Sequence, residues 1–261
     1  SAQDALALRS AASGRHDAVL IGGGLLGLEA GHSLIKLGLR VTVVDGNDRL
    51  LAKQLDPAAA GMLQARLEAM GFAFRLSDGV TAIDGGLGRG HVAFKREPGT
   101  DTDLVLVSAG VRSNLGLAQA AGIQAERGVV VDDALRTDHS GIFAAGDVAS
   151  HRGTVYGVWL PSKEQGDRAG QAMAGRDVSY TGSVMSHKLK VAGIDLISLG
   201  EIDAEGKLES QVRRDAERGI YRKLVFRDGA LVGAILLGDS TGHQEIARAI
   251  AEKRLPADVS A

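Results

Sequence analysis

Apolar runs separated by glycines dominate the first part of the chain. Residues 17–21 and 40–44 are short and almost wholly apolar, a pattern typical of parallel strands that are buried on both faces. Between them a helical pattern runs from the glycines at 22–24 to Gly38, where a helix is expected to end. The pattern predicts a strand–helix–strand unit over residues 16–45.

Further elements follow from the same periodicities and from turn residues. Asp56 and Pro57 suit the N-cap and the first turn of a helix that ends near Met70. Asp228-Gly229 is a hairpin signal. Other strands are expected at 72–75, 79–83, 91–95, 103–110, 128–131, 140–148, 189–191, 196–198, 221–226 and 230–237. Other helices are expected at 1–15, 114–121, 161–174 and 242–253. This order predicts an α/β protein with a small β-meander near residues 72–100.

The turn after the first strand carries the first candidate chemistry. Residues 22–27 read GGGLLG, a G-x-G-x-x-G placed between a strand and a helix. Gly22 permits the tight turn, Gly24 lets the backbone approach a pyrophosphate, and Gly27 lets the helix pack close to the strand. The amino end of that helix offers unpaired N–H groups and a positive dipole to phosphate. The alternative, glycines that serve only packing, leaves Asp45 without a role.

Asp45 ends the second strand about twenty residues past the glycines, where a carboxylate accepts hydrogen bonds from the adenosine ribose. The same charge repels a 2′-phosphate, so the sequence predicts NAD in preference to NADP. The expected NAD-binding residues are Gly22, Gly24, Leu25, Gly27 and Asp45.

Composition excludes several other classes. The chain has 261 residues, a net charge of −2 and 3% aromatic residues, which gives no support to nucleic-acid binding. No apolar run approaches the ~20 residues of a membrane span, so a cytoplasmic protein without membrane contact is expected. There is no cysteine, and the histidines lack metal-ligand spacing, so no metal is expected. No Tyr-x-x-x-Lys occurs, which disfavours a short-chain dehydrogenase.

The order of several segments resembles a known family. GGGLLGLEAG at 22–31, VTVVD at 41–45, VLVSAGVRSN at 105–114 and TDHSGIFAAGDVA at 137–149 are similar to class I pyridine-nucleotide-dependent FAD oxidoreductases. KLKVAGIDLISLG at 188–200 and YRKLVFRDGALVGAILLGD at 221–239 narrow the resemblance to rubredoxin reductases and the flavin portion of NADH-nitrite reductases. The resemblance implies a Rossmann-like, three-layer NAD-binding domain, a remnant of an FAD domain and a small α+β C-terminal domain.

The resemblance also implies roles for single residues. Glu29 matches a catalytic glutamate close to the nicotinamide, with an exposed helix residue as the alternative. Gly110, Gly146 and Asp147 match positions that contact the dinucleotide or FAD. Trp159 matches a tryptophan beside the flavin, although it could equally fill the core under the following helix. Two matches are weaker. Gln165-Gly166 matches a helix contact with the edge of the flavin, and Arg49 would either pair with a phosphate or be a solvated surface side chain.

The family also implies a domain plan. It comprises a linker helix (1–15), the NAD-binding domain (16–101), the second FAD segment (102–178) and the C-terminal domain (179–261). The family begins with an FAD half-domain that carries its own G-x-G-x-x-G, and this chain has only the NAD motif. A truncated member is therefore expected, in which FAD binding by this chain alone is doubtful. Without that half-domain, strand 103–107 leaves an apolar sheet edge, so a homo-oligomer or a chain or segment that supplies the missing half is expected.

Three functions remain open at this point. The first is a portion of an NADH-dependent flavoprotein oxidoreductase, which passes hydride from NADH to FAD and electrons on to rubredoxin or to a haem/iron–sulfur module of nitrite reduction. The second is an NAD-binding or interaction module that no longer holds FAD and does not turn over. The third is a flavin-independent NAD dehydrogenase, which needs a proton relay that the sequence does not reveal.

Overall fold

The computed structural model describes residues 2–85, 88–96, 98–191 and 193–253 and is built around two sheets. The first sheet has four parallel strands in the order β3-β2-β1-β7. Their bounds are Phe72–Arg75 (β3), Arg40–Val44 (β2), Asp17–Ile21 (β1) and Leu104–Val107 (β7). This strand order is the core of a Rossmann-like domain.

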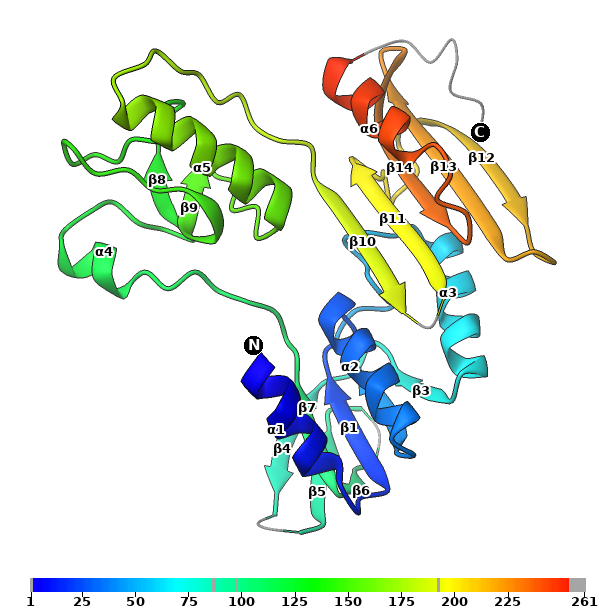
Figure 1. The fold of residues 1–261 in the computed structure, drawn as a ribbon. Coiled ribbons are helices and arrows are strands. Elements are labelled where there is room, and N and C mark those ends of the chain that lie inside the picture. Colours follow the sequence, from blue (N-terminus) through cyan, green and yellow to red (C-terminus); the bar gives the residue numbers. More distant parts are fainter. Residues whose placement is uncertain (1, 86–87, 97, 192, 254–261) are drawn as a thin grey trace.

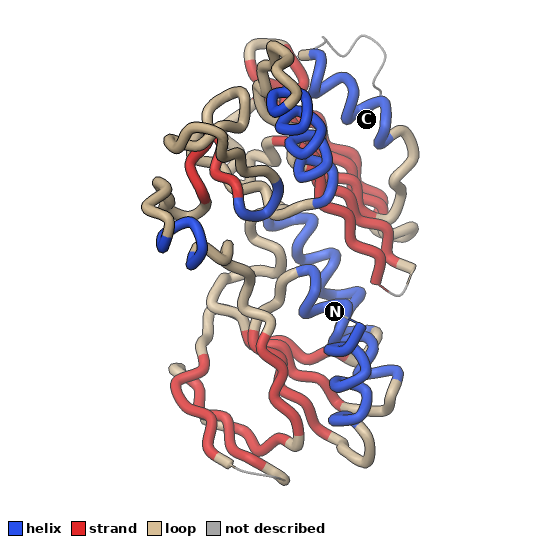
Figure 2. The backbone as a smooth tube through the Cα atoms, turned by 60° about the vertical axis from the view of Figure 1, so that its left-hand side comes forward, coloured by secondary structure: helices blue, strands red, loops and turns tan. Residues whose placement is uncertain are grey.

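Both faces of this sheet are covered, which makes three layers (Figure 2). Helices α1 (Ala2–Ala12), α2 (Leu25–Lys36) and α3 (Pro57–Ala69) contribute to the apolar cluster on one face. On the other face, Val19 and Val44 pack against Val92 and Phe94 of a three-stranded antiparallel sheet. Its strands are β4 (Val80–Asp84), β5 (Gly90–Phe94) and β6 (Thr100–Thr102). This sheet is the meander expected near residues 72–100, but its strands differ from the expectation. Strand 72–75 (β3) belongs to the parallel sheet, and the unpredicted β6 is the third strand of the meander.

The middle of the chain forms a smaller unit around its own apolar cluster. It contains α4 (Gly116–Ala120), the parallel pair β8 (Val129–Val131) and β9 (Ala149–His151), the 3₁₀ turn η1 (Gly146–Val148) and α5 (Trp159–Met173). Val131, Leu135, Ala149, Ala169 and Tyr180 form that cluster. In Figure 1 this unit is joined to the first sheet by the segment after β7 and to the second sheet by the segment before β10.

The C-terminal part is a five-stranded antiparallel sheet in the order β10-β11-β14-β13-β12. The strands are β10 (Ser186–Val191), β11 (Ile194–Gly200), β12 (Glu209–Asp215), β13 (Ile220–Arg227) and β14 (Ala230–Leu237). Helix α6 (His243–Glu252) packs Ile246, Ala249 and Ile250 onto one face. The mixed α/β fold expected from the sequence is thus confirmed.

The second face of the C-terminal sheet packs on the helices of the first domain. Leu196, Ile235 and Leu237 share one apolar cluster with Leu63 and Leu67 of α3. Asp56 joins the two parts at the start of α3, because its Oδ1 accepts from Ala59 N at 2.9 Å while its Oδ2 accepts from the Tyr221 hydroxyl at 2.6 Å. The N-cap of α3 is therefore also an anchor for the C-terminal sheet.

Three sequence predictions need correction. The expected strand at 140–148 is wrong: Phe143 makes only an isolated bridge to Arg136, and residues 146–148 form the turn η1. Strands β6, β9 and β12 were not predicted. The expected boundary after residue 101 would cut β7 from the sheet in which it pairs with β1. Strand β7 is also less buried than expected, because it is the edge strand: three of its side chains are half-buried and Val107 is exposed.

Candidate functional site

The glycine-rich turn is held against the strand that follows the meander. Gly22 has a φ of +107°, and a Cβ there would come within 2.3 Å of the Ser108 carbonyl oxygen. A Cβ on Gly27 would come within 2.3 Å of the Gly22 carbonyl oxygen. Both positions therefore require glycine, because the opposing atoms belong to the backbone and cannot give way. The turn is fixed by close packing on both sides.

Gly24 differs from its neighbours because a Cβ there would meet no heavy atom within 4 Å. It is exposed and is the N-cap of α2, with no side-chain hydrogen bond to the first turn. A helix start leaves N–H groups without intrahelical partners, and the helix dipole makes them attractive to anions. Open space in front of such a helix start is the shape that a pyrophosphate group requires.

Asp45 lies beside this helix start. Its Oδ2 accepts from Gly23 N at 2.7 Å, and its Oδ1 accepts from Asn47 N and Asn47 Nδ2 at 2.8 and 2.7 Å. These partners are uncharged amides. A carboxylate offers about four lone-pair directions, so one direction of Oδ2 remains for a further hydroxyl donor. The carboxylate is thus both a brace for the turn and a free acceptor at its rim.

The loop that carries Asp45 is itself held by the segment after β3. Asp45 N donates to Arg75 O at 2.9 Å, Asp78 N donates to Asp45 O at 3.1 Å, and Ser77 N donates to Asn47 O at 2.7 Å. Asp78 is 5% exposed, and its Oδ1 accepts from Gly79 N, Lys95 N and Arg96 N. Backbone hydrogen bonds therefore set the position of the Asp45 carboxylate. Neither Asn47 nor Asp78 was expected from the sequence to support this loop.

A second group of predicted residues lies along the segment from β7 to α5. The chain leaves the glycine turn at Ser108 and passes Gly110, which has a φ of +98°. Ser113 Oγ then donates to Asp147 O at 2.7 Å. Residues 108–113 thus connect the glycine-rich turn to η1. They link the first group of candidate residues, the glycine-rich turn with Asp45, to the second group, which comprises Gly110, Gly146, Asp147 and Trp159.

The turn η1 is fixed from inside by α5. Gly146 has a φ of +81°, and its N–H donates to Gln165 Oε1 at 2.8 Å, where Gln165 is fully buried. The exposed Asp147 accepts at Oδ1 from Ser162 Oγ at 3.1 Å. The Gln165 side chain therefore points inward and acts on Gly146, which the resemblance to a flavin-edge contact did not indicate.

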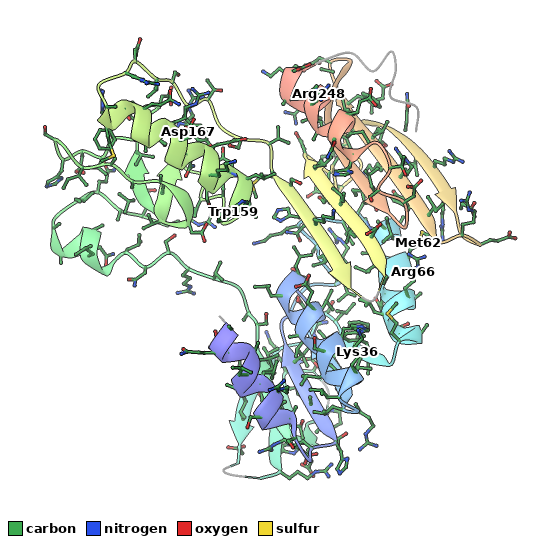
Figure 3. The ribbon with its side chains drawn as sticks, viewed as in Figure 1. Lys36, Met62, Arg66, Trp159, Asp167 and Arg248 are labelled. Carbon is green, nitrogen blue, oxygen red and sulfur yellow. The ribbon has the colours of Figure 1, made fainter. Side chains whose placement is uncertain are left out.

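Trp159 begins α5 and is 79% exposed (Figure 3). The alternative that it fills the core under this helix is wrong. Other large apolar side chains from the same part of the chain are also exposed, namely Val107, Val111, Leu117, Ile142 and Leu160. These six side chains make the segment from β7 to α5 unusually apolar on its surface.

Two further expectations concern charged residues. Glu29 lies on α2 and is exposed, and its carboxylate makes no hydrogen bond or ion pair with the described residues. Arg49 is not a freely solvated side chain: it is 24% exposed, its Nη1 pairs with Asp48 at 2.8 Å, and its Nε is buried without a partner. Within the described residues no group of three or more histidine or acidic side chains could hold a metal ion, and no helix is long and apolar enough to cross a membrane.

Family models match almost the whole chain. Residues 1–174 match the model described as pyridine nucleotide-disulphide oxidoreductase. Residues 186–254 match the model described as the rubredoxin NAD+ reductase C-terminal domain. The residues between the two matches, 175–185, form the connection between α5 and β10.

Curated relatives agree with this assignment. The assimilatory nitrate reductase electron transfer subunit of Bacillus subtilis (strain 168) is 38% identical over 253 residues, which is 97% of this chain and 33% of the relative. The rubredoxin-NAD(+) reductase of Pseudomonas putida is 38% identical over 163 residues, which is 61% of this chain and 42% of the relative. The chain therefore spans about a third to two fifths of the length of these relatives.

Solved structures show the same fold at lower identity. A NAD-dependent persulfide reductase from A. fulgidus has a TM-score of 0.84 at 23% identity, over 97% of this chain and 52% of that one. The NADH:rubredoxin oxidoreductase from Clostridium acetobutylicum has a TM-score of 0.75 at 24% identity, over 100% of this chain and 65% of that one. Sequence and fold agree, and this chain belongs to the pyridine nucleotide-disulphide oxidoreductase family.

Proposed function

We propose that this chain is the NAD-binding and C-terminal portion of an NADH-dependent flavoprotein oxidoreductase. The observation that carries the proposal is the arrangement at the start of α2, where the open space at Gly24 faces unpaired N–H groups and Asp45 lies beside it. Pyrophosphate suits the first feature and a ribose hydroxyl suits the second. The family and the names of the relatives support the same activity.

Each residue of the first group has a distinct task in holding the dinucleotide. The backbone N–H groups of Gly24 and Leu25 face the phosphates, and the exposed edge of Gly24 leaves room for them. Asp45 uses its remaining lone pair of Oδ2 for a ribose hydroxyl, and its charge opposes a 2′-phosphate. Glu29, one turn further along α2, is the side chain proposed to lie near the nicotinamide.

The second group fits the sugar and ring portions of FAD. Gly110 and Gly146 allow close backbone approach, and Asp147 exposes a carboxylate for ribityl hydroxyls. The exposed indole of Trp159 suits a flavin ring and would exclude water from it. FAD when bound accepts hydride from the nicotinamide and releases electrons singly. The adenine end of FAD would be held by a segment or chain outside these 261 residues.

The electron acceptor is proposed to be a further protein or module. The relatives include a rubredoxin-NAD(+) reductase, an assimilatory nitrate reductase electron transfer subunit and nitrite reductases. A rubredoxin-like carrier or a haem/iron–sulfur module is therefore the class of acceptor proposed here.

Spectroscopy of the purified protein tests the proposal. We expect the intact protein to be yellow, with flavin absorbance that NADH bleaches and a redox dye restores. Asp147→Ala should lower the flavin content, because a hydroxyl acceptor is lost, whereas Asp167→Ala on the exposed face of α5 should leave it unchanged.

An intact protein, with the part that holds the adenine end of FAD present, that binds NADH, retains no flavin and reduces no dye would contradict the proposal. That outcome would instead support the NAD-binding module that does not turn over. A protein that binds neither NADH nor flavin would contradict both the oxidoreductase and the NAD-binding module.

A further inference from the structure

The outer strand of the C-terminal sheet is exposed along most of its length. Strand β12 pairs with β13 and ends the sheet, and Figure 1 shows it on the side of the molecule away from α5. The side chains from Glu209 to Arg214 are exposed, and only Asp215 is half-buried. Within the part of the chain that the structure describes, no strand pairs with the outer edge of β12. Such an edge offers a row of N–H and C=O groups to another strand.

Two opposite charges on this strand, Glu209 and Arg213, lack partners among the described residues. Neither Glu209 nor Arg213 forms an ion pair or side-chain hydrogen bond with the residues that the structure describes. Arg213 lies directly opposite Arg222 of β13, a like-charge pair that is unfavourable across two strands. The Arg222 side chain is 12% exposed, donates to Thr241 O at 3.1 Å and lies 3.9 Å from the Asp239 carboxylate. These contacts hold Arg222 in place, and they leave the charge of Arg213 without a counter-charge.

Strand geometry limits how β12 can pair with a second copy of itself. In an antiparallel pair, facing residues must both direct their backbone groups toward the partner or both direct them away. In a two-fold arrangement, one residue of β12 must therefore lie opposite the same residue of the second copy. The possible central residues are the middle three of the strand, Gln211, Val212 and Arg213. A pair centred on Val212 sets Glu209 against Asp215, and one centred on Arg213 sets two arginines together. A pair centred on Gln211 sets Glu209 against Arg213 twice.

We propose that β12 is the interface between two copies of this chain, paired antiparallel about Gln211. The two sheets then join into one across a two-fold axis, as in isologous dimers. Each unpaired Glu209 meets the unpaired Arg213 of the other copy, and the new carboxylate lies beside the arginine pair formed by Arg213 and Arg222. The proposal does not depend on the bound cofactor.

The absence of cysteine makes a direct register test possible. Gln211→Cys in the 261-residue chain places two thiols across the axis with Cα atoms ~4.5–5.5 Å apart, within disulfide range. We expect mild oxidation to give a covalent dimer. Val212→Cys is the matched control and should stay monomeric on a denaturing gel. A mixture of Glu209→Cys and Arg213→Cys chains should cross-link, and either variant alone should not.

Charge substitutions test the same pairing without oxidation. Arg213→Glu should weaken dimerisation at least about tenfold in sedimentation velocity, because two attractive pairs become repulsive. The double change Glu209→Arg with Arg213→Glu should restore the dimer. Arg218→Glu makes the same charge change in the exposed turn after β12 and should have no effect.

Three results would overturn the proposal. The first is a wild-type chain that sediments as a monomer at every concentration. The second is a dimer that Arg213→Glu leaves intact. The third is cross-linking by Val212→Cys in place of Gln211→Cys, which would show a different register.

Discussion

Single glycines and one carboxylate define the candidate site at the residue scale. Gly22 and Gly27 are required by backbone contacts of 2.3 Å, whereas Gly24 has open space where a Cβ would lie. The same residue type therefore serves folding at two positions and a ligand at the third. Asp45 combines both tasks, since it braces Gly23 and Asn47 and keeps one acceptor direction free.

The two kinds of glycine predict opposite effects of alanine. Gly27→Ala should destabilise the protein by about 1–3 kcal/mol, because the added methyl group clashes with the Gly22 carbonyl oxygen and pushes α2 away from the glycine-rich turn. Gly24→Ala should cost about 1 kcal/mol or less but weaken NADH binding about tenfold, because the methyl group fills the space in front of the helix. Urea unfolding and NADH titration of both variants separate the effects. Equal losses of stability would contradict this division.

At the element scale, α5 controls the turn that presents Asp147. Gln165 is fully buried and gives Gly146 N its acceptor. Gln165→Leu should therefore destabilise the protein by about 1–3 kcal/mol, because the half-buried Gly146 N–H loses its acceptor inside the protein. Gln171→Leu on the same helix, where the amide contacts the exposed Asp167, should change stability by no more than ~0.5 kcal/mol. Thermal or urea unfolding measures both, and equal effects would contradict the role of Gln165.

The pair β8–β9 should carry an acid-sensitive link. Asp133 accepts from Arg152 and from the buried His151, and these hydrogen bonds lower the pKa of Asp133 to about 2. Because the folded pKa lies below the ordinary value of 3.8, the link contributes fully above that value and is lost as the pH falls toward about 2. Asp133→Asn should thus destabilise the protein at pH 5, and the difference from wild type should shrink by pH 2.5. A difference independent of pH would contradict this assignment.

Sequence patterns predicted elements well where the hydrophobic period was clear. The expected bounds agree within one or two residues for β1, β2, α3 and α6, and the turn at Asp228-Gly229 has positive φ at both residues, as a hairpin turn requires. The segment 140–148 is apolar but finds a strand partner only at Phe143. Strand β12 lacks an apolar face altogether, because all but one of its side chains are exposed. Local patterns hold no information about such partners.

For the candidate site, the sequence revealed the glycines and Asp45 but not their supports. The backbone bonds from Arg75 and Asp78 and the inward turn of Gln165 depend on tertiary contacts between distant segments. No local spacing marks these residues. Trp159 was ambiguous for the same reason, since only its observed exposure separates a surface role from a core role.

At the scale of the whole molecule, the C-terminal sheet and the NAD-binding helices share one core. Asp56 and Tyr221 link the two parts, and Lys223 Nζ lies 3.4 Å from the same Asp56 oxygen. Burial and the neighbouring Asp56 carboxylate raise the pKa of Tyr221, so its hydroxyl stays a donor. The two domains should accordingly unfold together.

Loss of this link should be felt by the whole molecule. Tyr221→Phe should lower the free energy of unfolding by about 1–3 kcal/mol, because the buried Asp56 carboxylate loses a donor. Glu205→Gln breaks an exposed ion pair with Lys207 and should change it by ~0.5 kcal/mol at most. Calorimetry should show one transition for Tyr221→Phe, shifted to lower temperature. An unshifted transition would contradict the proposed anchor.

Choice between the two pyridine nucleotides tests the central claim most directly. Calorimetric titration should show that wild type binds NADH at least about tenfold more tightly than NADPH, because Asp45 accepts from the ribose and repels a 2′-phosphate. Asp45→Asn should weaken NADH binding and reduce the ratio of the NADH affinity to the NADPH affinity. Equal affinity of wild type for both nucleotides, or an Asp45→Asn variant with unchanged NADH affinity, would contradict the account.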